Sequence, residues 1–233
     1  MSGHCCGPAI RHFDQAIAER DLARYRQKGL DKRARLLLEG IRRSGLSGRS
    51  VLDVGSGAGT LSLELLKAGA THATLADASP AYLAAAKTEA ARASLVDRVD
   101  IVPGDFVETV DRISPADIVI LDRVVCCYPA WSAVLAAAMS RGRALLGLTY
   151  PRARADVRLV FAIDNLGRRV KGDAFRAFVH PPAAMQADLQ AGGWRLMSRR
   201  GTFAWRVDLY ELSGISTRER TAGTLHSIRD ETP

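Results

Sequence analysis

The stretch Val51-Leu52-Asp53-Val54-Gly55-Ser56-Gly57-Ala58-Gly59-Thr60 decides the fold of this 233-residue chain. It begins as a short apolar strand, continues through three glycines at alternate positions, and opens into a segment with helical spacing. Glycines at 55, 57 and 59 permit a sharp turn and leave bare backbone where a ligand can approach, because no side chain fills that space. The stretch therefore predicts a strand, a ligand-binding turn and a helix.

The same strand–helix unit recurs along the chain. Strand-like runs are expected at residues 50–54, 73–76, 99–102, 117–121, 144–148, 194–199 and 203–212. Helical spacing is expected at 9–22, 31–43, 60–67, 80–93, 129–139, 157–170 and in a segment that ends at Gln190. Right-handed crossovers between such units build a parallel, doubly wound sheet, with the run 117–121 near its centre because it is almost entirely apolar. The last two runs predict an antiparallel hairpin at the sheet edge.

Composition excludes several classes of protein. With 47% apolar and 25% charged residues the chain is neither disordered nor fibrous. It has no run of about 18 apolar residues and no signal-peptide pattern at Met1, so we expect a cytoplasmic protein without a membrane partner. The net charge of +8 would suit nucleic acid or an acidic small molecule. Because no run of five basic residues occurs, we expect a small molecule as the partner and consider nucleic acid an unlikely one.

Acidic residues around the glycine turn indicate the ligand. Asp77 stands 22 positions after Gly55, at the end of the next strand, where a carboxylate can accept hydrogen bonds from a ribose diol. Asp53 would be unfavourable beside a pyrophosphate but suits a ligand that carries an ammonium and a sulfonium group. Asp105 could accept from an adenine amino group, and Phe106 could stack on the ring. This pattern favours S-adenosylmethionine over a nicotinamide or flavin nucleotide, whose turn has a different glycine spacing.

From about Val51 to Trp131 the chain resembles the core of the class I S-adenosylmethionine-dependent methyltransferases. The resemblance implies an α/β fold with a doubly wound, mostly parallel seven-stranded sheet that binds S-adenosylmethionine at the carboxyl ends of its first strands. The expected cofactor-binding residues are Asp53, Gly55, Ser56, Gly57, Gly59, Asp77, Ala78, Asp105, Phe106 and Asp122. We expect residues 1–46 to form an N-terminal helical lid, residues 47–212 the binding domain and residues 213–233 a flexible tail.

Outside this core the chain resembles the magnesium-protoporphyrin IX O-methyltransferase branch of the superfamily. The resemblance depends on His12-Phe13-Asp14 and on the segment from Asp122 to Pro129, with weaker support from residues 149–152 and 179–181. It implies a carboxylate of a porphyrin-like acidic acceptor, which an arginine-rich entrance would suit. The chain departs from the branch at Cys127, where the branch has histidine, and at residues 12–14, where the branch has an aromatic residue, Phe and Asn.

Methyl transfer from a sulfonium mainly requires alignment of acceptor and methyl carbon, because the donor is already activated. A carboxylate acceptor needs no base, whereas a hydroxyl or an amine needs a proton acceptor within hydrogen-bond reach. The candidate catalytic residues at the acceptor are Tyr128, Cys127, His12 and Tyr25.

Three alternatives remain open from the sequence. The basic surface would also suit a nucleic-acid-modifying or nucleic-acid-binding protein, and a cofactor-binding partner without activity would carry the same glycine turn. The pairs Cys5-Cys6 and Cys126-Cys127, with His4, could form a soft-metal or metalloid site, as in a thiophilic metalloid methyltransferase. Adjacent cysteines lack the spacing of zinc ligands, so the competing interpretation is four ordinary thiols and no resident metal.

Overall fold

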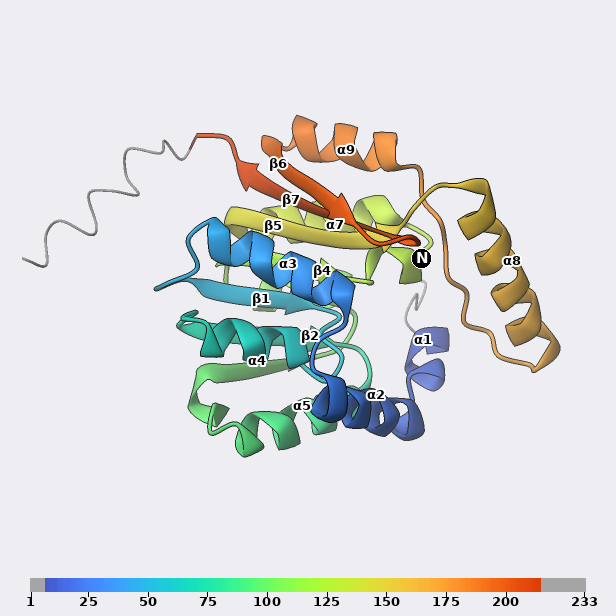
Figure 1. Ribbon diagram of the computed structural model, residues 1–233, viewed down its shortest axis with the longest axis horizontal. Helices are drawn as coiled ribbons and strands as arrows, with labels where there is room; N and C mark the ends of the chain where they lie inside the picture. Colours follow the sequence, from blue (N-terminus) through green and yellow to red (C-terminus); the bar gives the residue numbers. More distant parts are fainter. Residues whose placement is uncertain (1–6, 215–233) are drawn as a thin grey trace, which may run out of the picture.

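A seven-stranded sheet with the order β3-β2-β1-β4-β5-β7-β6 forms the centre of the protein (Figure 1). The computed structural model describes residues 7–214. The strands are β1 (Ser50–Val54), β2 (His72–Asp77), β3 (Val99–Pro103), β4 (Ala116–Asp122), β5 (Gly142–Pro151), β6 (Trp194–Gly201) and β7 (Trp205–Leu212). The first five are parallel, whereas β7 runs antiparallel to both β5 and β6. The expected doubly wound sheet, its central fourth strand and its terminal antiparallel hairpin are confirmed.

Helices cover both faces of this sheet. They are α1 (Gly7–His12), α2 (Gln15–Lys28), α3 (Lys32–Arg43), α4 (Thr60–Lys67), α5 (Pro80–Arg92), α6 (Phe106–Thr109), α7 (Trp131–Arg141), α8 (Ala155–Val170) and α9 (Pro182–Ala191). Ser79 begins α5 as expected, since its side chain accepts a hydrogen bond from the Tyr82 N–H and Pro80 follows at the first helical position. None of the helices between residues 7 and 214 has the length and apolar character that a bilayer crossing requires.

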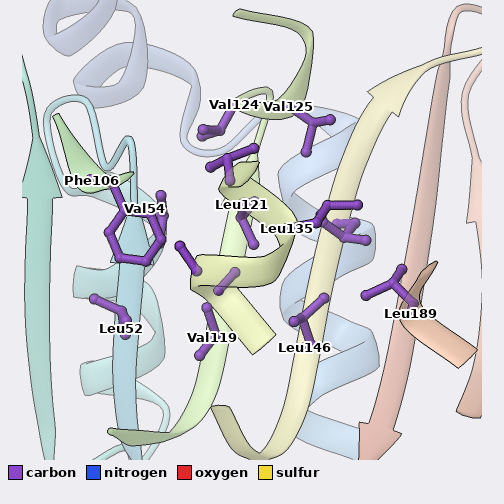
Figure 2. Packing of buried hydrophobic residues seen from close by; sticks show 14 of the residues in the cluster. Leu52, Val54, Phe106, Val119, Leu121, Val124, Val125, Leu135, Leu146 and Leu189 are labelled. Carbon is purple, nitrogen blue, oxygen red and sulfur yellow. The ribbon is translucent and has the colours of Figure 1, made fainter. Parts of the chain in front are cut away.

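Alternation along the strands divides the core into two layers. Leu52, Val119 and Leu146 face α7 and α9, where they pack against Leu135 and Leu189 (Figure 2). The neighbouring residues of the same strands face α3, α4 and α5 on the opposite side. Since both faces are covered, residues 51–54 of β1 and 118–121 of β4 are apolar except at Asp53.

The N-terminal region differs from the expected continuous helix over residues 9–22. The Asp14 side chain accepts a hydrogen bond from the Ile17 N–H at 3.0 Å, so Asp14 begins a new helix and the chain turns at Phe13. The expected lid over residues 1–46 is also smaller, because Leu37 and Ile41 of α3 are buried on the sheet. Within the described residues α1, α2 and the start of α3 line the cavity at the carboxyl ends of the strands (Figure 1).

Candidate functional site

A deep cavity lies where β1, β2 and β4 end, beneath α1 and α2. Its space amounts to about 1270 Å³ when the open solvent at its mouth is included. Residues 55–58, 76–79 and 122–124 form its floor, and residues of α1, α2 and the start of α3 form the opposite wall. The carboxyl ends of parallel strands meet at this edge, so the sheet brings together segments that are far apart in the sequence.

The glycine turn forms the part of the floor next to β1. Gly55 and Gly57 have φ values of 60° and 55°, in the left-handed region that favours glycine. The Gly55 N–H donates to the Ala76 carbonyl at 2.7 Å, and the Gly57 N–H donates to Oδ2 of Asp77 at 2.8 Å. Both glycines and Ser56 line the cavity, so their bare backbone faces the space available to a ligand.

Asp77 is held rigidly at the end of β2. Its Oδ1 accepts from the Ser79 N–H at 2.8 Å, while Oδ2 accepts from Gly57. Burial raises the pKa of this carboxyl, although hydrogen bonds from the Ser79, Gly57 and Ala78 backbone oppose the shift. An ionised carboxylate offers about four acceptor positions, so Asp77 retains capacity for a diol. Asp77 and Ala78 both line the cavity.

Asp53 and Gly59 do not line the cavity, although both were expected among the cofactor-binding residues. The Asp53 carboxylate is 2% exposed and accepts a hydrogen bond from Oγ of Ser62 at 2.7 Å, behind the turn. Gly59 has a φ of 67°, and a Cβ at this position would stand 2.8 Å from Cδ1 of Leu75. Both residues therefore support the turn on the side that faces away from the cavity.

Past β3, Phe106 lines the cavity and Asp105 supports it from outside. Oδ1 of Asp105 accepts from the Val107 N–H at 3.0 Å and from the hydroxyl of Tyr128 at 2.8 Å. Tyr128 also lines the cavity, but its hydroxyl proton is directed to Asp105. The geometry thus makes Tyr128 a wall residue, and Asp105 is not among the lining residues.

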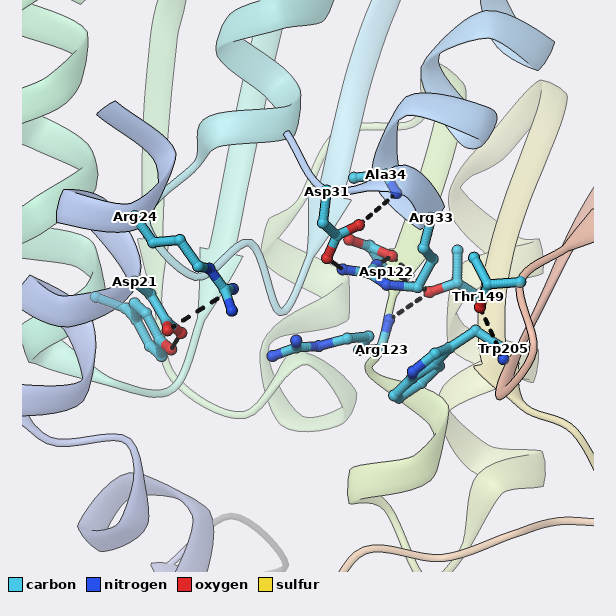
Figure 3. A network of polar contacts seen from close by, with 11 residues as sticks. Asp21, Arg24, Asp31, Arg33, Ala34, Asp122, Arg123, Thr149 and Trp205 are labelled. Carbon is cyan, nitrogen blue, oxygen red and sulfur yellow. Dashed lines mark hydrogen bonds and ion pairs between the residues drawn. The ribbon is translucent and has the colours of Figure 1, made fainter. Parts of the chain in front are cut away.

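Beyond β4 the cavity wall becomes a network of charged groups (Figure 3). The guanidinium of Arg33 is buried and forms ion pairs with Asp31 and Asp122. Thr149 Oγ donates to Asp122 and accepts the backbone N–H of Arg123 at 2.8 Å. Burial and the nearby charge of Arg123 lower the pKa of Arg33 to about 10, so Arg33 remains a cation at neutral pH. The two carboxylates carry one charge more than Arg33 neutralises, and the nearby charge of Arg123 also lowers the pKa of Asp31.

Arg123 is held in the same wall but forms no direct ion pair with a carboxylate of the described residues. Its φ of 64° is left-handed, and its guanidinium lies 6.0 Å from the ring centroid of Trp205. Among residues 7–214 no carboxylate lies within ion-pair distance of this guanidinium, and Arg123 lines the cavity. Trp205 is half-buried between Arg33 and Arg123.

The remaining acceptor-side candidates have different outcomes. His12 is not in the cavity, because its Nδ1 contacts Asp173 at 2.6 Å and its ring stacks on Phe175. Tyr25 lines the cavity, but its hydroxyl donates to Glu64 at 2.6 Å, and burial with this hydrogen bond raises its pKa. A tyrosine in this state is not a ready base.

Cys127 also lines the cavity. The hydrogen bond that the Cys127 thiol donates to Cys126, together with burial, raises the pKa of Cys127 well above its usual value, so this thiol is protonated at neutral pH. Both cysteines are free thiols directed at the Arg123 carbonyl. No three histidine, cysteine or acidic side chains of residues 7–214 are grouped to hold a metal ion. His4, Cys5 and Cys6, on which the metalloid hypothesis also depends, lie outside the described residues.

Sequence reasoning misses Arg33, Arg123 and Trp205. Arg33 follows the helix-capping Asp31 and would pass as a surface residue of an amphipathic helix. Arg123 directly follows the strand that ends at Asp122, a position where side chains commonly reach a ligand, and this is the one signal that could have identified it.

Comparison with known proteins agrees with this architecture. A family model described as a methyltransferase domain matches residues 51–146. The magnesium protoporphyrin IX methyltransferase of Synechocystis PCC 6803 with bound SAH is 20% identical, with a TM-score of 0.62 over 88% of this chain and 85% of that chain. An O-methyltransferase family protein from Burkholderia thailandensis is 16% identical, with a TM-score of 0.69 over 88% and 63%. A putative RNA methyltransferase from Pyrococcus horikoshii is 16% identical, with a TM-score of 0.56 over 77% and 84%. No curated protein sequence matches the chain.

Proposed function

We propose that this chain, whose residues 51–146 match a methyltransferase domain model, is a class I S-adenosylmethionine-dependent methyltransferase that methylates a small acidic acceptor held beside Arg123. The acceptor class is a carboxylate of a porphyrin-like or other aromatic acid. The single observation that supports an acidic acceptor is the guanidinium of Arg123, which lines the cavity wall and forms no direct ion pair with a carboxylate of residues 7–214.

The proposed cofactor site comprises the glycine turn and Asp77. Gly55, Ser56 and Gly57 would contact the methionine portion, Asp77 with Ala78 the ribose, and Phe106 the adenine, since all of them line the cavity. When bound, the cofactor supplies an electrophilic methyl group. We assign Asp53 and Gly59 to positioning this turn, since their side chain and backbone lie behind it.

An anionic acceptor fits the groups available on the other wall. Tyr25 and Cys127 are protonated, and Tyr128 directs its hydroxyl to Asp105. A carboxylate acceptor needs none of them as a base, because it is already ionised near neutral pH. Arg123 would orient the acceptor through charge-assisted hydrogen bonds, and the flat face of Trp205 restricts where that guanidinium can point.

Turnover with methyl-labelled S-adenosylmethionine tests the proposal. Magnesium protoporphyrin IX and smaller aromatic acids serve as acceptors, each beside its methyl ester. We expect labelled product from at least one acid and none from the corresponding ester. Label found only in RNA added to the same reaction would contradict the proposal and favour nucleic-acid modification.

Arg123→Gln tests the residue itself. Loss of a hydrogen bond to a charged group is worth about 1.5–3 kcal/mol, so KM for the acidic acceptor should rise roughly 10- to 100-fold. The dissociation constant of the cofactor, measured by titration calorimetry, should stay within about twofold. Arg143→Gln, an exposed arginine at the far end of β5, is the matched control. Weaker cofactor binding with an unchanged KM would assign Arg123 to the cofactor and remove the support for an acidic acceptor.

A further inference from the structure

Helix α8 lies at the edge of the molecule and is bound to it through one face (Figure 1). On this inner face Val157 is buried, and Phe161 packs against the ring of Trp205 at 6.2 Å. The Asn165 amide exchanges two hydrogen bonds with the backbone of Ala177, at 2.8 and 2.9 Å. Arg168 lies over the ring of Phe175. These contacts fix the rotation of α8 about its own axis.

The opposite face of α8 is apolar and exposed. Leu159, Ile163 and Leu166 are each 61% exposed, and Val170 is 80% exposed. They follow one another at spacings of 4, 3 and 4 residues, about half a turn from the inner face. A continuous stripe of this kind marks an interaction surface, whereas a single exposed leucine would need no explanation.

The residue types on the stripe indicate what covers it. The spacing makes Ile163 and Val170 the a positions, and Leu159 and Leu166 the d positions, of a heptad repeat. β-Branched residues at a with leucine at d favour two parallel helices over larger assemblies. From residue 160 to residue 167 the flanking e and g positions carry the uncharged Val160, Ala162 and Gly167, and the charged Arg169 occupies only the last g position. Over this central part of the stripe no like charges would oppose close approach of two identical helices.

We propose that the outer face of α8 is a two-fold interface with a second copy of this chain, in which the two α8 helices run parallel. The stripe is then self-complementary, as a two-fold interface requires. The body of each copy would lie on the inner side of its own helix, away from the partner. Dimerisation would also hold Trp205 and Phe175 in place, and through them the wall that contains Arg123. The interface does not depend on the methyl acceptor.

Sedimentation velocity of the full chain tests this interface. We expect a dimer, twice the chain mass of 25.2 kDa, that dissociates on dilution. Ile163→Glu would place a charge at the centre of the interface, and we expect it to weaken the dimer at least about tenfold. Val96→Glu, a valine that is 55% exposed on another surface, is the matched control and should leave the dimer intact. Monomeric wild-type protein, or an unchanged dimer for Ile163→Glu, would overturn the proposal.

Oxidative cross-linking tests the orientation. In a parallel pair, cysteines that replace Ile163 would face each other across the axis and form a disulfide, whereas cysteines that replace Asp164 would point aside. We expect covalent dimers for Ile163→Cys well above the background of the unaltered chain and of Asp164→Cys. Cross-linking only when Ile163→Cys is mixed with Leu166→Cys would overturn the parallel arrangement. Retained cofactor affinity in every variant shows that the fold is intact, so this test is independent of the acceptor experiments.

Discussion

At the scale of single residues, Gly57 and Gly59 have nearly the same backbone conformation but different neighbours. Gly57 faces the cavity, and a Cβ there would meet Tyr82 at an ordinary 3.7 Å. Gly59 faces buried Leu75 at 2.8 Å. We predict that Gly59→Ala lowers the free energy of unfolding by about 1–3 kcal/mol through left-handed strain and overpacking. Gly57→Val carries left-handed strain as well, but no packed neighbour crowds its Cβ, and it should in addition abolish cofactor binding. Urea denaturation and calorimetry separate the two, and equal effects on both measurements would contradict this division.

Asp53 provides a prediction about pH. Burial raises its pKa to about 7, the hydrogen bond from Ser62 opposes the shift, and the charge of Asp77 adds to it. An aspartate in the unfolded chain titrates near about 3.9, so between about pH 4 and pH 7 the folded chain binds the proton more tightly. The contribution of Asp53 to stability therefore falls as pH rises through this window.

Asp53→Asn should remove this loss, because an amide oxygen still accepts from Ser62 without charge. We expect the stability of the variant relative to wild type to increase by about 2–4 kcal/mol from about pH 4.5 to about pH 7.5. Urea denaturation at each pH measures the difference. A difference that does not change with pH would show that Asp53 titrates normally.

At the scale of elements, the start of α3 combines a helix cap with an ion pair. Oδ1 of Asp31 accepts from the Ala34 N–H at 2.9 Å, while Oδ2 accepts from Arg33 at 2.8 Å. Burial opposes ionisation of Asp31, but Arg33 and the cap outweigh it and hold the pKa of this carboxyl below its usual value. We predict that Asp31→Ala destabilises the fold by about 1–3 kcal/mol, and that Asp31→Ser, which retains a cap, costs less. If thermal unfolding showed the same loss of stability for Asp31→Ala and Asp31→Ser, the cap would contribute nothing.

The elements that the sequence predicts well are those with local signals. Ser79 and Pro80 define the start of α5 because a cap and a first-turn proline act on adjacent backbone. The break between α1 and α2 is missed for the converse reason, since Asp14 sits inside a run with helical spacing and its capping depends on the chain turning at Phe13. The carbonyl of Phe13 accepts from Ser79 Oγ at 2.6 Å, a contact 66 residues away that no local pattern contains.

In the candidate site, too, local sequence signals predict contacts well and long-range contacts are missed. The glycine turn and Asp77 belong to one strand–turn–helix–strand unit, so their spacing alone predicts that they meet. Arg33 and Arg123 come from segments 90 residues apart, and only the folded sheet brings both beside Trp205. The Asp53 side chain could point either toward the ligand or toward Ser62. The direction depends on the backbone at the end of a buried strand, and the residue type alone does not determine it.

At the scale of the whole molecule, side-chain contacts hold α1 and α2 over the cavity. The Tyr82 hydroxyl donates to Asp21 at 2.7 Å, and Arg26 pairs with buried Glu89 at 2.7 Å. These contacts connect α2 to α5, whereas α7 and α9 pack on the other face of the sheet. A ligand bound beneath α2 should therefore suppress local unfolding of α1 and α2 more than local unfolding of the distant helices.

Hydrogen exchange should report this directly. Saturating S-adenosylmethionine should slow exchange in residues 7–28 and leave α9 unchanged, because residues of α1 and α2 line the cavity and no residue of α9 does. Without ligand, Tyr82→Phe should speed exchange in α2 by about fivefold, the value of one hydrogen bond of about 1 kcal/mol. Tyr150→Phe is the matched control, since its hydroxyl bonds Asp208 at 2.6 Å on the opposite side of the sheet. Uniform protection of α2 and α9 would mean that the ligand stabilises the whole fold instead of closing α1 and α2 over the cavity.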